Sequence, residues 1–317
     1  MSFDLPKPDL TEERRGNTGT PGVWLFEADA PGRTVLITAL IHGNELCGAW
    51  ALKDLLASSL RPRSGRLIMA FCNLDAFDRF DPRQHDASRY VDEDLNRVWQ
   101  DERLADARTS ERRRAAELLP WVQQADWLLD LHSMHEPSAP LLLTGLLPRN
   151  IALARALQAP GHVIVDAGHK DGVRLRDYAR FGDPHEDACA LLIECGFHGD
   201  PASRDVARDM VARLLEESGI IEHGDLPEGW LLPTPATQRV LEVTQAVVAS
   251  SMDLTFAADW QGLETLAHAG DLIGWAEGRP IVAPYDACTL IMPSLRQLRP
   301  GVTVVRLARE YLPASPA

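Results

Sequence analysis

Apolar positions follow two different periods along the first two thirds of the chain. Continuous apolar runs of strand length lie at residues 34–41, 66–72, 127–131 and 190–193. Between them, apolar side chains recur at helical spacing over residues 45–58, 109–124 and 201–218. Shorter strand candidates lie at 23–26, 141–143 and 162–165, with a helix near 151–157. Because strands alternate with helices, the pattern predicts an α/β fold with a largely parallel central sheet.

The pattern changes near residues 224–235. Beyond this point the chain has only short β-like segments separated by Gly and Pro, at 239–243, 254–256, 272–275, 280–283, 289–292 and 302–307. Such spacing is typical of a small all-β domain, for which a barrel-like arrangement is one option. We therefore predict two domains, residues 1–224 and 225–317.

Polar residues with metal-binding side chains follow two of the buried strands. His42 comes directly after the run 34–41, with Glu45 three residues later, and His132 follows the run 127–131. In open α/β sheets, functional sites lie at the carboxyl ends of the strands. Two imidazoles and one carboxylate form a catalytic zinc set that leaves one position open for water. We predict one zinc ion per chain, with a purely structural His–Glu pair as the alternative.

Three further residues near these strands have two interpretations each. Asp130 shares a strand face with His132, so it could orient that ring or cap a backbone group. His135 is a candidate fourth ligand, although a loop histidine is favoured. Glu194 ends the run 190–193, and a carboxylate there is costly to bury without a function or a partner. It suits the general base of a metal-assisted hydrolysis, while a structural ion pair is the alternative.

Residues 75–100 carry many charges and few periodic apolar positions. Loops of this length in a compact domain are usually functional or disordered. Within the loop, Asn96 lies beside Arg97, and a guanidinium can grip both oxygens of a substrate carboxylate. From composition alone, a solvated charged surface is the favoured interpretation.

Composition narrows the class of protein. The 317 residues carry a formal net charge of −14, which argues against a nucleic acid or an anionic membrane as partner. The five cysteines form no CxxC pair and are expected to be small buried residues. The first residues lack the pattern of a signal peptide, and no apolar stretch reaches the ~20 residues of a membrane span. We expect a cytoplasmic protein. No HExxH, P-loop, GxGxxG or GxSxG motif occurs.

Taken together, four motifs give the chain a resemblance to the succinylglutamate desuccinylase/aspartoacylase family, which is itself similar to the zinc carboxypeptidases. They are His42-Gly43-Asn44-Glu45, the loop from Arg89 to Arg97, Asp130-Leu131-His132, and Ile193-Glu194-Cys195-Gly196. Each motif is weak alone, but together and in this order they are specific. The resemblance implies a mixed central sheet of the zinc carboxypeptidase kind, flanked by helices, with a smaller all-β C-terminal domain.

The resemblance also implies roles for individual residues. His42, Glu45 and His132 would bind zinc, and Glu194 would act first as general base and then as general acid. Arg89 would polarise the scissile carbonyl. Asn96 and Arg97 would hold the carboxylate of the substrate. The family's usual tyrosine from the C-terminal domain has Tyr285 as its candidate here, with an ordinary core tyrosine as the alternative.

These roles predict zinc-dependent hydrolysis of a small N-acyl amino acid. Aspartoacylase-like relatives place an arginine shortly before the catalytic glutamate to hold an acidic side chain. Here the candidate is Arg180, but the nearer residues are acidic. This departure favours a neutral or basic amino acid as product. A zinc carboxypeptidase acting on short peptides and a non-catalytic zinc-binding protein remain as alternatives. The acyl group is not set by the sequence, and a homo-oligomer stays open.

Overall fold

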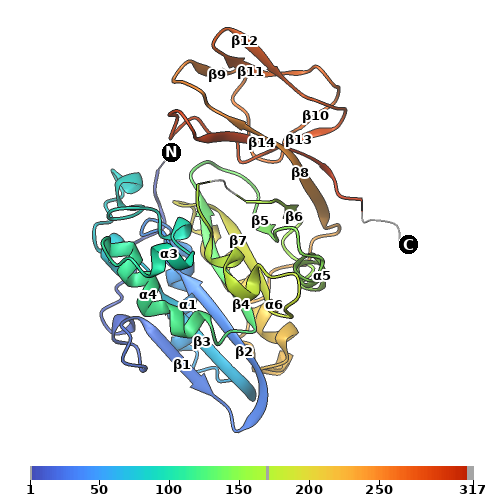
Figure 1. Ribbon diagram of the computed structural model, residues 1–317. Helices are drawn as coiled ribbons and strands as arrows, with labels where there is room; N and C mark the ends of the chain where they lie inside the picture. The colour runs from blue at the N-terminus through green and yellow to red at the C-terminus, as the bar shows by residue number, and fades with distance from the viewer. Residues whose placement is uncertain (1, 169–170, 313–317) are drawn as a thin grey trace.

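The computed structural model describes residues 2–168 and 171–312, and its centre is one large mixed sheet (Figure 1). Within these residues eleven strands pair in the order β1-β3-β2-β4-β7-β5-β6-β8-β14-β13-β10. The first seven in chain order are β1 (Val23–Glu27), β2 (Ala30–Ala39), β3 (Ser64–Phe71), β4 (Trp127–Met134), β5 (Leu141–Leu143), β6 (His162–Val165) and β7 (Cys189–Phe197).

The middle of the sheet is parallel, as the alternation of strands and helices predicts. Strand β2 pairs in parallel with both β3 and β4, and β4 pairs in parallel with β7. The strands beyond this core reverse direction, because β1 runs antiparallel to β3 and β5 runs antiparallel to β7. The mixed α/β sheet is therefore confirmed, and the parallel core places the ends of β2, β4 and β7 at one edge.

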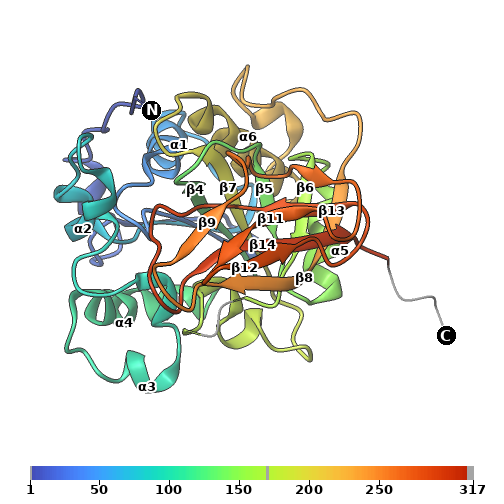
Figure 2. The same ribbon diagram turned by 90° about the horizontal axis from the view of Figure 1, so that it is seen from above.

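Helices cover both faces of this sheet (Figure 2). On one face, Val35 and Ile37 of β2 share a core with α1 (Leu46–Ala57), α5 (Pro148–Ala156) and α6 (Ala202–Ser218). On the other face, Leu36 packs in a second core with α4 (Ser110–Val122). Successive side chains of a strand point to opposite faces, so a strand covered on both sides needs a continuous apolar run. The remaining helical segments are short: α2 (Leu74–Asp78), α3 (Asp101–Leu104) and the 3₁₀ turns η1 (Glu13–Arg15), η2 (His85–Ser88), η3 (Leu95–Arg97), η4 (Leu175–Asp177), η5 (Ala179–Phe181) and η6 (His223–Asp225).

The C-terminal strands extend the main sheet instead of closing a separate barrel. Strand β8 (Arg239–Val248) pairs first with β6 and then with β14 (Thr303–Glu310), which continues through β13 (Cys288–Ile291) to β10 (Thr265–Leu266). A second sheet of three strands, β9 (Leu254–Phe256), β11 (Leu272–Ala276) and β12 (Arg279–Val282), lies above them (Figure 1). All six predicted segments are strands, but the short strand β10 and the pairing of β8 with β6 were not predicted. A domain boundary at residue 224 stays a prediction.

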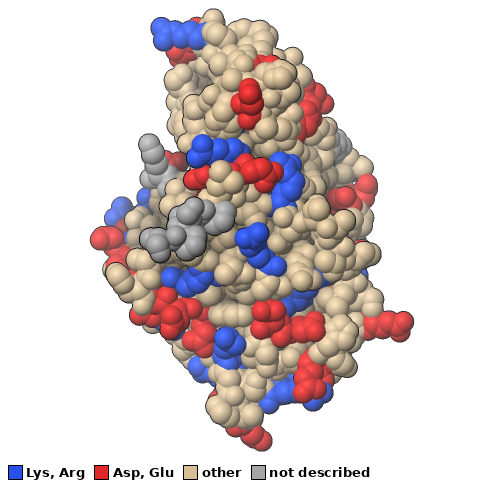
Figure 3. All heavy atoms as spheres, turned by 90° about the vertical axis from the view of Figure 1, so that its right-hand side faces the viewer, with Lys and Arg blue, Asp and Glu red and all other residues tan. Residues whose placement is uncertain are grey.

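Two expectations from composition can be compared with the structure. All five cysteines are free and buried, as predicted. Within the described residues, no helix has the length and apolar character needed to cross a membrane. Acidic and basic side chains are interspersed on the face shown in Figure 3, so the net negative charge does not form a continuous acidic surface there.

Candidate functional site

A tight turn carries the first two polar residues from β2 into α1. His42 lies just beyond the end of β2, and Glu45 immediately precedes the first residue of α1. Gly43 lies between them, where a Cβ atom would collide with the backbones of Ala76, Phe77 and Ser88. The close approach of these segments therefore requires glycine at position 43. The tight turn around this glycine brings His42 and Glu45 close together.

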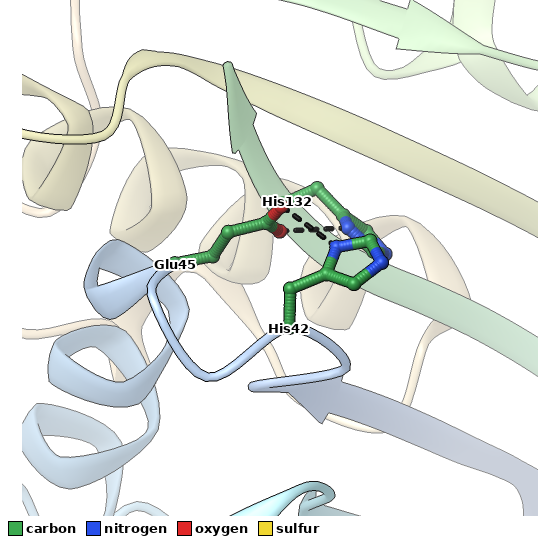
Figure 4. Close-up of side chains that lie close together, drawn as sticks. All are labelled: His42, Glu45 and His132. Atoms are coloured by element: carbon green, nitrogen blue, oxygen red, sulfur yellow. Dashed lines mark hydrogen bonds and ion pairs between the residues drawn. The ribbon is translucent and has the colours of Figure 1, made fainter. Parts of the chain in front are cut away.

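His42, Glu45 and His132 converge at the end of the parallel core (Figure 4). The Glu45 carboxylate bridges the two rings: Oε1 lies 2.7 Å from His42 Nδ1, and Oε2 lies 2.7 Å from His132 Nδ1. The three candidate ligand atoms lie within 4.8 Å of one another, and all three residues are buried. Burial raises the pKa of Glu45, but the two histidines outweigh it and hold that pKa well below its usual value. This donor set can hold a metal ion.

The outer nitrogen of each ring is held by a second carboxylate. Nε2 of His132 lies 2.8 Å from Asp130 Oδ2, and Nε2 of His42 lies 3.0 Å from Asp94 Oδ1. The sequence left two roles open for Asp130, orienting the His132 ring or capping a backbone group. The structure shows the contact with the ring. A proton donated from Nε2 leaves the lone pair on Nδ1, which faces the shared centre. The sequence placed Asp94 in a motif but gave no signal for this contact.

Glu194 lies beside the metal-binding group without taking part in it. Glu194 is paired with His132 in the register of β4 and β7. Strand β7 does not end at the glutamate, as the sequence suggested, but continues to Phe197. The Oε2 atom of Glu194 is buried and has no hydrogen-bond partner in the described part of the chain. Burial, and then the negative charge of Glu45, raise the pKa of Glu194 to about 8. A carboxyl group with such a pKa can both accept and donate a proton near neutral pH.

The loop before α3 brings the other predicted residues to the same place. Arg89 Nη2 donates to Asp94 Oδ2 at 3.2 Å, and Nη1 lies 3.5 Å from Glu45 Oε1. Asn96 is buried, and its Oδ1 accepts from the backbone N–H of Leu175 at 2.9 Å. Arg97 Nη1 donates to the Asn96 carbonyl at 2.7 Å. Burial lowers the pKa of Arg97 to about 10, and nearby guanidinium groups add to the effect.

These residues line a cavity of about 840 Å³ whose opposite wall comes from the C-terminal strands and loops. Further arginines that sequence reasoning missed also line it, and two of them, Arg174 and Arg306, are buried. Arg174 Nη2 is buried without a hydrogen-bond partner among the residues that the structure describes, and Arg306 Nε lies 3.1 Å from Asp166 Oδ2. No motif contains either arginine, so only the folded chain reveals that they share a cavity with Arg97.

Two predicted residues are not brought to this cavity. Arg180 forms ion pairs with Glu186 at 3.0 Å and Asp126 at 3.6 Å, and it is not among the lining residues. Tyr285 packs against the C-terminal core, with its hydroxyl 2.6 Å from that of Thr244. His135 does line the cavity, but it lies outside the group formed by His42, Glu45 and His132.

Comparisons with known proteins place these features in a family. The family model for the succinylglutamate desuccinylase/aspartoacylase catalytic domain matches residues 31–211. The succinylglutamate desuccinylase of Burkholderia cenocepacia is 26% identical over 324 aligned residues, which cover 92% of this chain and 88% of that protein. The succinylglutamate desuccinylase of Burkholderia lata is 27% identical, covering 90% of this chain and 83% of the relative.

Solved structures show the same fold. A succinylglutamate desuccinylase from Vibrio parahaemolyticus superposes with a TM-score of 0.68 at 17% identity, covering 92% of this chain and 86% of its own. A succinylglutamate desuccinylase/aspartoacylase from Rhodobacter sphaeroides gives a TM-score of 0.64 at 22% identity, covering 93% and 92%. The similarity therefore extends beyond the catalytic domain into the C-terminal strands.

Proposed function

The chain belongs to the succinylglutamate desuccinylase/aspartoacylase family, and on this basis we propose that it is a zinc-dependent hydrolase of small N-acyl amino acids. One observation carries the proposal. The buried group His42–Glu45–His132 lies directly beside Glu194. This carboxylate has a raised pKa, and one of its oxygens forms no hydrogen bond with the described residues. A metal-binding group next to a proton-exchanging carboxylate is the combination that hydrolysis of an amide requires.

The proposed metal ligands are Nδ1 of His42, Nδ1 of His132 and the Glu45 carboxylate, which already face one another. Two imidazoles and one carboxylate fit zinc, and three protein ligands leave room for substrate or water. When bound, zinc polarises a carbonyl and lowers the pKa of a water molecule toward ~7. Metal analysis of the purified protein separates zinc from cobalt and manganese, which accept similar ligands.

The protein side chains divide the remaining work. Glu194 accepts a proton from the attacking water and returns it to the nitrogen of the departing amine. Arg89 donates hydrogen bonds to the oxygen that becomes negatively charged during the attack. Arg97 holds the carboxylate of the substrate, with Asn96 positioned beside it. Burial and the surrounding cations lower the pKa of Arg97, and a bound carboxylate would relieve that destabilisation.

The arginines of the cavity bear on the substrate. A neutral or basic product was favoured because Arg180 is somewhat distant from the glutamate in sequence and the nearer residues are acidic. Arg180 pairs with Glu186 and Asp126 outside the cavity. Arg174 supplies a guanidinium instead, since it lines the cavity and one of its donors has no partner within residues 2–168 and 171–312. Arg306 adds a second positive charge in the same cavity. We therefore favour a substrate with a second carboxylate, in its acyl group or in its amino-acid side chain.

Two alternatives are weaker. A carboxypeptidase needs space for a peptide, whereas residues from Ile291 to Arg306 wall off the cavity on one side. A non-catalytic metal-binding protein has no need of Glu194, Arg89 and Arg97, all of which line the cavity. The cytoplasmic location and a homo-oligomeric state stay predictions.

The test is amine release from N-acetyl, N-formyl and N-succinyl derivatives of acidic, neutral and basic amino acids. Zinc-loaded wild type is compared with Glu194→Gln, and a tetrapeptide is included. Hydrolysis of an N-acyl amino acid by the wild type alone would support the proposal, and the preferred derivative would reveal the side chain. Cleavage of only the tetrapeptide would favour the peptidase. No turnover by zinc-loaded protein would overturn the deacylase.

A further inference from the structure

His135 lies where β4 meets the C-terminal wall of the cavity, which is formed by residues between 291 and 306; we call this wall the C-terminal roof. This histidine follows β4, lines the cavity, and is within hydrogen-bond distance of three segments of the chain. Next to it, Glu136 forms an ion pair with Arg296 at 3.1 Å and accepts from Ser294 Oγ at 3.2 Å. Residues 135–136 are therefore a point of attachment between the two halves of the cavity.

The partners of His135 determine which ring nitrogen carries the proton. Nε2 lies 3.5 Å from Arg89 Nη1 and 3.1 Å from Gln297 Nε2. A guanidinium and an amide nitrogen only donate hydrogen bonds, so Nε2 must accept with its lone pair. On the other side of the ring, Nδ1 lies 3.0 Å from Asp86 Oδ1 and 3.3 Å from His198 Nε2. A carboxylate only accepts, so Nδ1 must carry the hydrogen.

We propose that His135, as its Nδ1–H tautomer, is a positioning residue that directs the Arg89 guanidinium. Arg89 is held on three sides: by Asp94 at 3.2 Å, by Glu45 at 3.5 Å and by His135. The two carboxylates attract the Arg89 guanidinium toward the group formed by His42, Glu45 and His132. The lone pair on the neutral His135 ring accepts from Nη1 and so fixes the orientation of the guanidinium plane. The same lone pair accepts from Gln297, which ties the C-terminal roof to this orientation. The inference rests on the proposed function, because it assigns Arg89 to the substrate carbonyl.

The tautomer can be measured without turnover. Two-bond ¹H–¹⁵N correlation spectra of zinc-loaded, ¹⁵N-histidine-labelled wild type report which imidazole nitrogen is protonated, and His135→Gln identifies the signals of this ring. We expect a protonated Nδ1 and an unprotonated Nε2. A protonated Nε2 would overturn the proposal, whatever reaction the protein catalyses.

The kinetic test compares two amides that place an acceptor at different positions. A glutamine side chain can present its oxygen near the place of Nε2, whereas asparagine reaches only the place of Nδ1. We expect His135→Asn to lower kcat roughly 10- to 100-fold, because a misdirected group costs about this much, with KM changed less than about threefold. His135→Gln should recover most of that loss. His223→Gln, at an exposed histidine paired with Glu216, is the matched control.

A double-mutant cycle separates positioning from general damage to the fold. In an Arg89→Ala background, His135→Asn should have no further effect on kcat, because His135 acts through Arg89. Equal losses in His135→Gln and His135→Asn, or additive losses in the double variant, would contradict the proposal. A wild type active on N-acyl amino acids together with an unchanged His135→Asn would overturn the positioning role alone. An inactive zinc-loaded wild type would overturn the proposed function, while the spectra would still decide the tautomer.

Discussion

Asp130 holds the ring of His132 from the side opposite to Glu45. Its Oδ2 lies 2.8 Å from Nε2 of that ring, and its Oδ1 accepts from the hydroxyl of Thr38 at 2.7 Å. Asp130 is completely buried, so its two oxygens have no competing contact with bulk solvent. The carboxylate therefore fixes both the rotation and the tautomer of a proposed metal ligand.

Replacing this carboxylate should weaken metal binding without removing it. We expect Asp130→Asn to lower the affinity for zinc roughly 10- to 100-fold, the usual effect of losing a residue that orients a metal ligand. Competition with a chelator of known affinity measures the change. An unchanged zinc affinity would show that Asp130 serves only the packing around Thr38.

The Glu194 carboxylate should be needed for turnover but not for the binding of zinc. We expect Glu194→Gln to reduce kcat roughly 10²- to 10⁴-fold, because proton transfer by a positioned side chain contributes about this much. Zinc content, measured by elemental analysis, should stay at the wild-type level. Loss of metal along with activity would instead identify Glu194 as a ligand.

Two arginines, one inside the cavity and one outside it, test which guanidinium binds the substrate. Arg97→Ala should raise KM roughly 10-fold or more with little effect on kcat, because it removes a charge-assisted bond present in both the ground state and the transition state. Arg180→Ala should leave both constants unchanged, since Arg180 is paired with Glu186 away from the cavity. The opposite result would return the substrate-binding role to Arg180.

The glycine between the first two proposed ligands should tolerate no side chain. Gly43→Ala would place a Cβ against the backbones of Ala76, Phe77 and Ser88, and backbone cannot rotate out of the way. We expect the free energy of unfolding to fall by about 1–3 kcal/mol, the usual cost of overpacking. Zinc affinity should fall as well. The control is Gly224→Ala, where an added Cβ meets open space. Equal urea midpoints for both variants would rule out the steric constraint.

A buried histidine should make a destabilising contribution at acidic pH, while the raised pKa of Glu194 contributes in the opposite direction. Burial, and then the nearby His135, keep the pKa of His198 well below its usual value of 6.5. Below pH 6.5 the unfolded chain therefore takes up a proton that the folded chain refuses. The stabilising contribution is complete above pH 6.5 and is lost as the pH falls, by up to about 1.4 kcal/mol per pH unit.

Urea unfolding at pH 7.5 and 5.0 measures this dependence, with a chelator present so that metal release does not contribute. The raised pKa of Glu194 contributes to both proteins, so the test is their difference: at pH 5.0 relative to pH 7.5, His198→Gln should gain stability compared with the wild type. His223→Gln, at an exposed position, should retain the wild-type dependence. An equal pH dependence in the wild type and in His198→Gln would mean that His198 is protonated in the folded protein.

The sequence predicted features that depend on local pattern. The strands of the parallel core are buried on both faces, so each appears as a continuous apolar run such as 35–41. The short segment from His42 to Glu45 predicted two adjacent ligands, because a tight turn from a strand into a helix leaves few arrangements for them. The third proposed ligand, His132, followed from the rule that sites in such sheets lie at the carboxyl ends of the strands.

The features that were missed depend on segments far apart in the chain. Arg306 reaches the cavity because β14 pairs with β8 and β8 with β6, a connection that no local pattern indicates. Arg180 was a candidate because it precedes Glu194 in the sequence, although at some distance, but its side chain pairs with Glu186. The contact of Asp94 with His42 likewise depends on how the loop folds back.

The pairing of β8 with β6 determines how the protein could be shortened. Residues 162–165 of β6 pair on one side with β5 and on the other with residues 239–242 of β8. A fragment ending at residue 224 would keep the proposed metal ligands and Glu194, yet it would expose Val163 and Ile164, both fully buried in the intact protein. An unprotected apolar strand of this kind recruits strands from other molecules. The fragment ending at residue 224 would therefore aggregate when produced alone. In the intact protein β8 covers the edge of β6 and so prevents this self-association.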